Sequence, residues 1–292
     1  MKDYVEENER ILNEWCRKFV EDKKHDEEYK DCEIEKFFAK DGIMNKGEFY
    51  IDEYYDGTIR RQESFIENTM WNECPLRVLF LTKDEYTSEK EAWDVRTETF
   101  YEKGGGTPPK NNTVSSSFFF QNEACILYGL RNTTPEKKTP FDEFSWEDAL
   151  SFSDEKIFAR INCKKEVGNP IILDNVLQDA IDKYYVYLKA QILTLDADIL
   201  VCCGNQKENN IILNTVYKIY EDEFEYVNCV DGKGTGMHYN SKRNKLAIDA
   251  YHLSFFKGGL EARYNETVGM YYEFLKYLKN KKNIDFSAPH RS

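Results

Sequence analysis

The chain has 292 residues, of which 41% are hydrophobic and 15% aromatic, so it carries enough apolar side chains for a sizeable core and is not an intrinsically disordered chain. Asp and Glu number 53 against 40 Lys and Arg, a net charge of −13, and this balance argues against a protein that binds nucleic acid over most of its surface. The basic exception is residues 229–292, which hold 11 cationic and 6 anionic side chains.

Hydrophobic spacing along the chain predicts helices that alternate with short apolar strands. The predicted helices are two charged ones within 5–39, followed by 59–71, 118–130, 145–152, 173–195, 205–220 and 260–282. The predicted strands are 76–82, 156–163, 198–204, 224–230 and 245–255, with loops at 41–57, 102–117 and 231–244. Such alternation indicates βαβ units. We therefore predict an α/β fold, a three-layer sandwich with a mainly parallel central sheet of four or five strands.

Residues 1–57 are the most acidic part of the chain, with 18 anionic and 10 cationic side chains. We interpret them as an acidic helical N-terminal extension, followed by an α/β domain over 58–292. No apolar run approaches the ~20 residues that span a bilayer, and the N-terminus lacks the apolar region of a signal peptide. We therefore expect a cytoplasmic protein that makes no membrane contact.

The eight cysteines include no C-x-x-C pair, so we predict reduced, mostly buried thiols and no metal site. Cys202 and Cys203 are neighbours in a predicted strand, so their side chains should point to opposite faces of the sheet. A dinucleotide site needs G-x-G-x-x-G after the first strand, and no glycine stands there. The chain also has no P-loop pattern, and we expect no cofactor.

Ligands of parallel sheets gather at the carboxyl ends of the strands. The residues at or just beyond the carboxyl ends of the predicted strands include Asp84, Asn162, the pair Gly204-Asn205, and His252. A carboxylate, an amide and an imidazole should therefore share one edge of the sheet, and we regard this convergence as the candidate site.

Four motifs over residues 74–282 resemble, in order and spacing, the uracil-DNA glycosylase superfamily. They are LTKDEY (81–86), FARINC (158–163), ILVCCG (199–204) and His252-Leu253-Ser254. The first family motif is Gly-Gln-Asp-Pro-Tyr and the last is His-Pro-Ser. Here the Asp, Tyr, His and Ser are present, whereas the Gly, the Gln and both prolines are replaced. The chain would be a divergent member.

The resemblance implies a monofunctional DNA glycosylase that hydrolyses the N-glycosidic bond of uracil or a modified pyrimidine by base flipping, either in DNA repair or in defence against invading DNA. Asp84 would orient a water and stabilise the oxocarbenium-like sugar, and His252 would donate a hydrogen bond to the anionic base. Asn162 would bind the Watson–Crick edge, Tyr86 would exclude a methyl group, and Phe120 would stack on the base. For DNA binding, the implied residues are Leu253, as a wedge, with Ser254 and Lys257 on a phosphate.

Two other functions remain open. A catalytically inactive glycosylase-fold protein could bind nucleic acid, or a protein through its acidic N-terminal helices. Alternatively, a related sheet could process free nucleosides or nucleotides. Each candidate residue also has a structural interpretation: Asp84 as a turn or helix cap, Asn162 as a partner of loop backbone, and His252 as a core histidine.

Overall fold

The computed structural model describes residues 2–44, 49–52, 58–61, 66–84, 91–92, 94–96, 117–168, 172–204, 210–228, 236–255, 257–284 and 286. The α-helices in these ranges are α1 (Tyr4–Lys23), α2 (Ile66–Glu73), α4 (Phe118–Asn132), α5 (Trp146–Glu155), α6 (Asp174–Lys183), α7 (Tyr185–Leu195), α8 (Ile211–Ile219) and α9 (Gly259–Tyr277). The strands are β1 (Gly42–Ile43), β2 (Phe49–Asp52), β3 (Thr58–Arg61), β4 (Val78–Thr82), β5 (Ala159–Asn162), β6 (Ile199–Gly204), β7 (Glu225–Tyr226), β8 (Gly236–Asn240) and β9 (Lys245–Tyr251).

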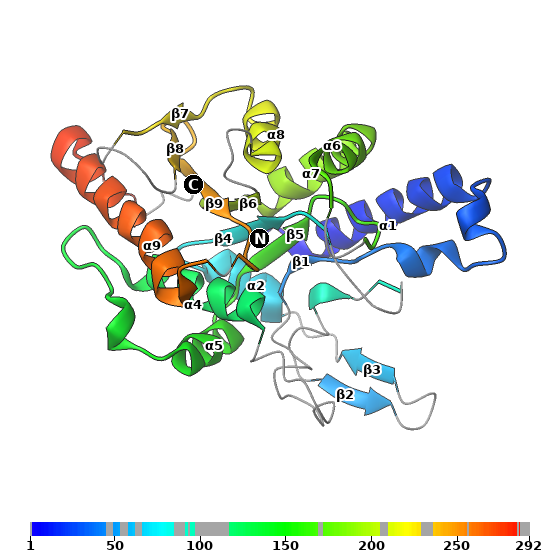
Figure 1. The fold of residues 1–292 in the computed structure, drawn as a ribbon, viewed down its shortest axis with the longest axis horizontal. Coiled ribbons are helices and arrows are strands. Elements are labelled where there is room, and N and C mark those ends of the chain that lie inside the picture. Colours follow the sequence, from blue (N-terminus) through cyan, green and yellow to red (C-terminus); the bar gives the residue numbers. More distant parts are fainter. Residues whose placement is uncertain are drawn as a thin grey trace.

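The main sheet has the strand order β1-β5-β4-β6-β9-β8-β7, and β2 and β3 form a separate antiparallel pair (Figure 1). The four central strands β5, β4, β6 and β9 are parallel, whereas β1, β8 and β7 pair antiparallel with their neighbours. The α/β class and the mainly parallel centre are therefore confirmed. The sheet has seven strands in the described residues, so the prediction of four or five was too low.

Strand β8 accounts for part of this difference, because it lies within the segment 231–244 that was predicted to be a loop. Its buried residues Met237 and Tyr239 alternate with half-buried positions. Their packing into the core outweighs the weak strand propensity of the surrounding sequence.

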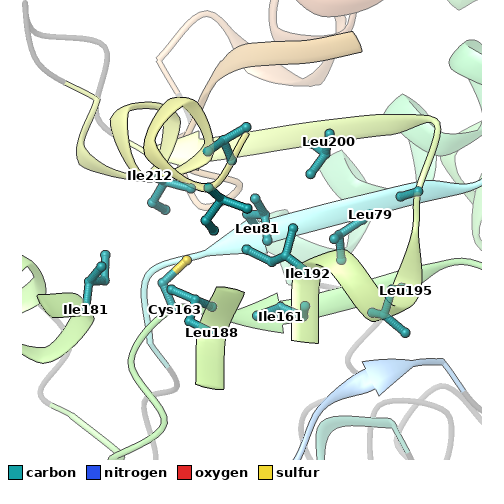
Figure 2. Close-up of a cluster of buried hydrophobic side chains, with 14 of the residues drawn as sticks. Leu79, Leu81, Ile161, Cys163, Ile181, Leu188, Ile192, Leu195, Leu200 and Ile212 are labelled. Atoms are coloured by element: carbon teal, nitrogen blue, oxygen red, sulfur yellow. The ribbon is translucent and has the colours of Figure 1, made fainter. Parts of the chain in front are cut away.

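Helices lie on both faces of the sheet, and the alternation of strand side chains decides which core each residue joins. Leu79 and Leu81 pack in one cluster with Leu188 and Ile192 of α7 and Ile212 of α8 (Figure 2). The intervening strand residues face the opposite cluster, which includes side chains of α4 and α9. Cys202 joins the first cluster and Cys203 the second, so the prediction that they face opposite sides is confirmed.

The N-terminal residues belong to the same core. Helix α1 begins at the Asp3 cap, whose side chain accepts a hydrogen bond from the backbone of Glu6, and it buries Leu12, Trp15 and Phe19 in the cluster that contains β4 and β6. Strand β1 pairs with β5 at the edge of the main sheet. The segment up to residue 44 is thus structurally continuous with the α/β sheet.

Three predicted helices differ from the structure. After α1 the chain makes two short 3-10 helices, Glu27–Tyr29 and Ile34–Phe37, and Asp31 between them interrupts any continuous helix with its left-handed conformation (φ 64°). The described parts of segment 59–71 belong to two elements, because residues 59–61 lie in β3 and residues 66–71 lie in α2. The segment 173–195 is two helices that meet at Tyr184, whose backbone (φ −113°, ψ 21°) leaves the helical region.

None of the described helices combines the length and the apolar character needed to cross a lipid bilayer.

Candidate functional site

The parallel register places the candidate residues at one edge of the sheet. Leu81 of β4 is opposite Cys202 of β6, which in turn is opposite Asp249 of β9. Asp84 and His252 each lie three residues beyond this row, toward the carboxyl ends of their strands. Because one strand separates β4 from β9, their backbones are about 10 Å apart.

This edge contains the point at which the strand order reverses. The chain passes from β4 to β5 on one side and from β6 to β9 on the other, so β4 and β6 border the switch point. In α/β sheets the crevice beyond such a switch point is the usual ligand site.

Asp84 is a buried carboxyl group, with 9% of its side chain exposed. Its Oδ2 lies 3.7 Å from Nζ of Lys164, beyond hydrogen-bond distance, and no described residue donates a hydrogen bond to it. Burial raises the pKa of Asp84 to about 6, and the charges of Lys164 and Lys83 oppose this rise. Gly168 also borders the carboxyl group, since a Cβ at this position would lie 2.0 Å from Oδ2.

Asn162 is buried at the end of β5, beside Thr82 of β4. Thr82 Oγ1 donates a hydrogen bond of 2.6 Å to Oδ1 of Asn162, so the carbonyl oxygen of this amide already has a partner within the protein. The backbone N–H of Asn162 donates to Oδ2 of Asp41 at 2.7 Å. Among the described residues, none accepts a hydrogen bond from Nδ2 of Asn162.

His252 lies where β9 ends, with its ring centroid 6.1 Å from that of Phe119. Burial is the main cause that lowers the pKa of His252 to about 4, and the nearby charge of Lys83 contributes less. The imidazole is therefore neutral at pH 7. Nδ1 accepts a hydrogen bond of 3.3 Å from the backbone N–H of Ser254. This bond assigns the ring proton to Nε2 and makes that nitrogen a donor.

The aromatic residues at the start of α4 divide between two environments. Phe119 lies beside His252, whereas Phe120 packs against a separate cluster that includes Tyr264 and Val268. The guanidinium carbon of Arg160 is 5.1 Å from the Phe119 ring centroid and 5.2 Å from that of Phe120. The ring nearest the candidate histidine is therefore Phe119, and stacking by Phe120 remains a prediction.

The turn between β9 and α9 departs from one expectation. Leu253 is 1% exposed, packs in the core and accepts a hydrogen bond from Asn122 through its carbonyl oxygen, so its side chain is not available as a wedge in DNA. Ser254 and Lys257 are exposed, as a phosphate contact requires. Phe255 is 37% exposed at the same turn. Tyr86 lies outside the described residues.

The structure thus brings Asp84, Asn162 and His252 to one edge but gives each a separate set of contacts. Within the described part of the chain, no hydrogen bond or ion pair joins any two of these three side chains. A cavity of about 10 Å³, the room of one water molecule, is lined by His252, Asn122, Tyr251 and Arg263 among others. Neither Asp84 nor Asn162 lines it.

Sequence reasoning missed several residues around the site. Lys164, Gly168 and Asp41 belong to segments that give no motif, and only the folded chain places them beside Asp84 or Asn162.

Within the described ranges, no three His, Cys, Asp or Glu side chains are grouped closely enough to hold a metal ion. The seven cysteines among these residues are free thiols, and Cys229 lies outside them.

Comparisons of the chain with family models, curated proteins and solved structures find no significant match. Its relationship to the uracil-DNA glycosylase superfamily therefore stays a prediction that rests on the four motifs.

Proposed function

We propose that the protein is a DNA glycosylase that hydrolyses the N-glycosidic bond of uracil or a modified pyrimidine. The observation that carries this proposal is the pair formed by Asp84 and His252, a buried carboxyl group and a neutral imidazole that each lie three residues beyond one row of paired strand residues, at the edge of the sheet that contains the switch point. We further propose that the sheet and its helices form a three-layer sandwich. The protein would act on DNA in the cytoplasm.

The two groups have the properties that glycosidic cleavage requires. Above its pKa, Asp84 is a carboxylate that can orient a water and stabilise positive charge on the sugar. Nε2 of His252 carries a proton without a positive charge, so it can donate a hydrogen bond to the anionic base. One such donor is typically worth ~2.7–4 kcal/mol in a transition state.

Base release from single- and double-stranded oligonucleotides that contain uracil or modified cytosines tests this proposal. Asp84→Asn and His252→Ala should each reduce release by about 100-fold or more. His238→Ala is the matched control, because burial also lowers the pKa of His238 to about 4 although this residue contacts Tyr217 instead. Equal activity of wild type and the two site variants would refute these assignments.

The pH dependence gives a second test. Because the pKa of Asp84 is about 6 and that of His252 is about 4, base release should fall below pH 6 as Asp84 becomes protonated. It should stay constant between pH 7 and pH 8. A rise in activity on acidification would contradict a carboxylate role for Asp84.

The contacts of Asn162 favour a second candidate, a catalytically inactive protein of this fold that binds nucleic acid or a protein partner. Oδ1 of Asn162 is already hydrogen-bonded to Thr82. The cavity beside His252 has room for about one water molecule. Binding of a fluorescent oligonucleotide without base release from any of the substrates would favour this alternative.

A further inference from the structure

The loop that follows β5 surrounds the carboxyl group of Asp84. Backbone hydrogen bonds from Cys163 to Thr82 and from Lys164 to Lys83, each 2.9 Å, continue the β4–β5 pairing beyond the strand ends. This pairing holds Lys164 alongside Lys83. The chain then returns so that Gly168 lies against both Oδ2 of Asp84 and Nζ of Lys164.

The ammonium group of Lys164 is fixed in this loop. Nζ donates a hydrogen bond of 2.5 Å to the carbonyl oxygen of Glu166 and lies 3.7 Å from Oδ2 of Asp84. Both side chains are only 9% exposed, so solvent screens their interaction far less than that of a surface pair.

The N-terminal segment holds the loop from the other side. The backbone N–H of Ala39 donates to the carbonyl of Lys165 at 2.8 Å, and that of Val167 donates to Phe37 at 3.1 Å. The carboxylate of Glu166 accepts hydrogen bonds from Tyr29 and from Lys23, the latter at 2.8 Å.

We propose that Lys164 is a positioning residue for Asp84: its ammonium group, held by a loop that the N-terminal segment clamps, orients the carboxyl group and favours its ionised form. As a role in catalysis this rests on the proposed glycosylase function, whereas the electrostatic contact does not. The charged groups that act on Asp84 within the described residues are Lys164 and Lys83. Lys83 is also engaged by Asp174 of α6, at 3.3 Å.

The experiment measures the pKa of Asp84 directly, by NMR titration of its ¹³Cγ signal, which Asp84→Asn assigns. Removing a cation at this distance in Lys164→Met should raise the pKa of Asp84 by roughly 1 to 3 pH units. Lys164→Arg retains the charge and should leave the pKa close to that of wild type. Lys242→Met is the control, since this lysine is 75% exposed and pairs with Glu223.

A measurement on the wild-type protein covers the case in which Lys164→Met does not fold. The ¹³Cε signal of Lys164 should change at the pH at which Asp84 titrates, because the two groups interact. Absence of that change, or an unaltered pKa of Asp84 in a folded Lys164→Met variant, would overturn the proposal.

Activity separates the positioning role from the proposed function itself. In Lys164→Met the acid limb of the base-release profile should move to higher pH together with the pKa of Asp84, and activity lost at pH 7 should return at pH 9. If no base release is found in wild type, the glycosylase proposal fails and the positioning role fails with it. The NMR result then still decides whether the two charges interact.

Discussion

Replacing Asp84 with Asn should stabilise the folded protein at neutral pH. The fold raises the pKa of this carboxyl group from 3.8 to about 6 because burial disfavours its charge. The contribution to stability is therefore fully present below pH 3.8 and is lost as the pH rises through 6. This rise in the pKa corresponds to a loss of about 3 kcal/mol in the free energy of unfolding at high pH. Asn resembles the protonated acid in shape and charge, so Asp84→Asn avoids this loss.

Thermal unfolding followed by circular dichroism at pH 5 and pH 8 measures the effect. Asp84→Asn should gain roughly 3 kcal/mol at pH 8 and about half of that at pH 5, and each kcal/mol should raise Tm by about 2–4 °C. Asp148→Asn provides a control of opposite sign, because hydrogen bonds from the backbone and side chain of Ser145 lower the pKa of Asp148. A loss of stability in Asp84→Asn, or a gain that is equal at both pH values, would refute the reasoning.

Three further substitutions test contacts of the fold and of the site. Glu123→Ala should cost about 3–5 kcal/mol in urea unfolding, because Arg160, 3% exposed, would lose the buried carboxylate that pairs with it; an unchanged midpoint would contradict this. Gly168→Ala should abolish base release with little change in Tm, because its methyl group would lie 2.0 Å from Oδ2 of Asp84 and turn that carboxyl group away; full activity would show that the close approach is absent. Ser145→Ala should cost about 1 kcal/mol in the same unfolding assay, because it removes the capping box of α5, and a neutral result would count against that cap.

Local patterns were sufficient for the central strands and for several helix boundaries. The continuous apolar run at β4 predicts a strand buried on both faces, and all five of its residues are buried. The helix predicted at 145–152 is also present as α5, and Ser145 and Asp148 form a capping box at its start. These features depend on residues close together in the chain, and for that reason sequence periodicity reveals them.

The edge strands and the breaks in helices depend on tertiary packing, which periodicity does not report. Strand β1 has two residues and exists because β5 offers it an edge. Helices α6 and α7 read as one continuous amphipathic segment, yet the chain breaks at Tyr184, whose ring packs beside Trp15 of α1. Such contacts join residues more than 110 positions apart, and no local propensity encodes them.

At the candidate site, too, the local sequence predicts some features, whereas tertiary contacts determine the others. The positions of Asp84 and His252 follow from the ends of recognisable strands, whereas their protonation depends on burial and on Lys83 and Lys164. Motif matching compares residue types at a spacing, and it carries no information on desolvation or on a cation from another loop. Leu253 illustrates the consequence, because its motif position suggests a DNA contact while its side chain fills the core.

Contacts from the N-terminal segment also determine the surroundings of Asn162 and Asp84. Asp41 is fully buried, and its carboxylate accepts hydrogen bonds from Lys165 at 2.6 Å, from Gln191 at 2.9 Å and from the backbone of Asn162 at 2.7 Å. A buried carboxylate bound in this way resists displacement, since removing Lys165 would leave its charge uncompensated. The residues beside Asp41 in the chain pair with the loop that carries Lys164. The acidic segment that resembles an appendage in sequence therefore fixes the end of β5 and the loop beside Asp84.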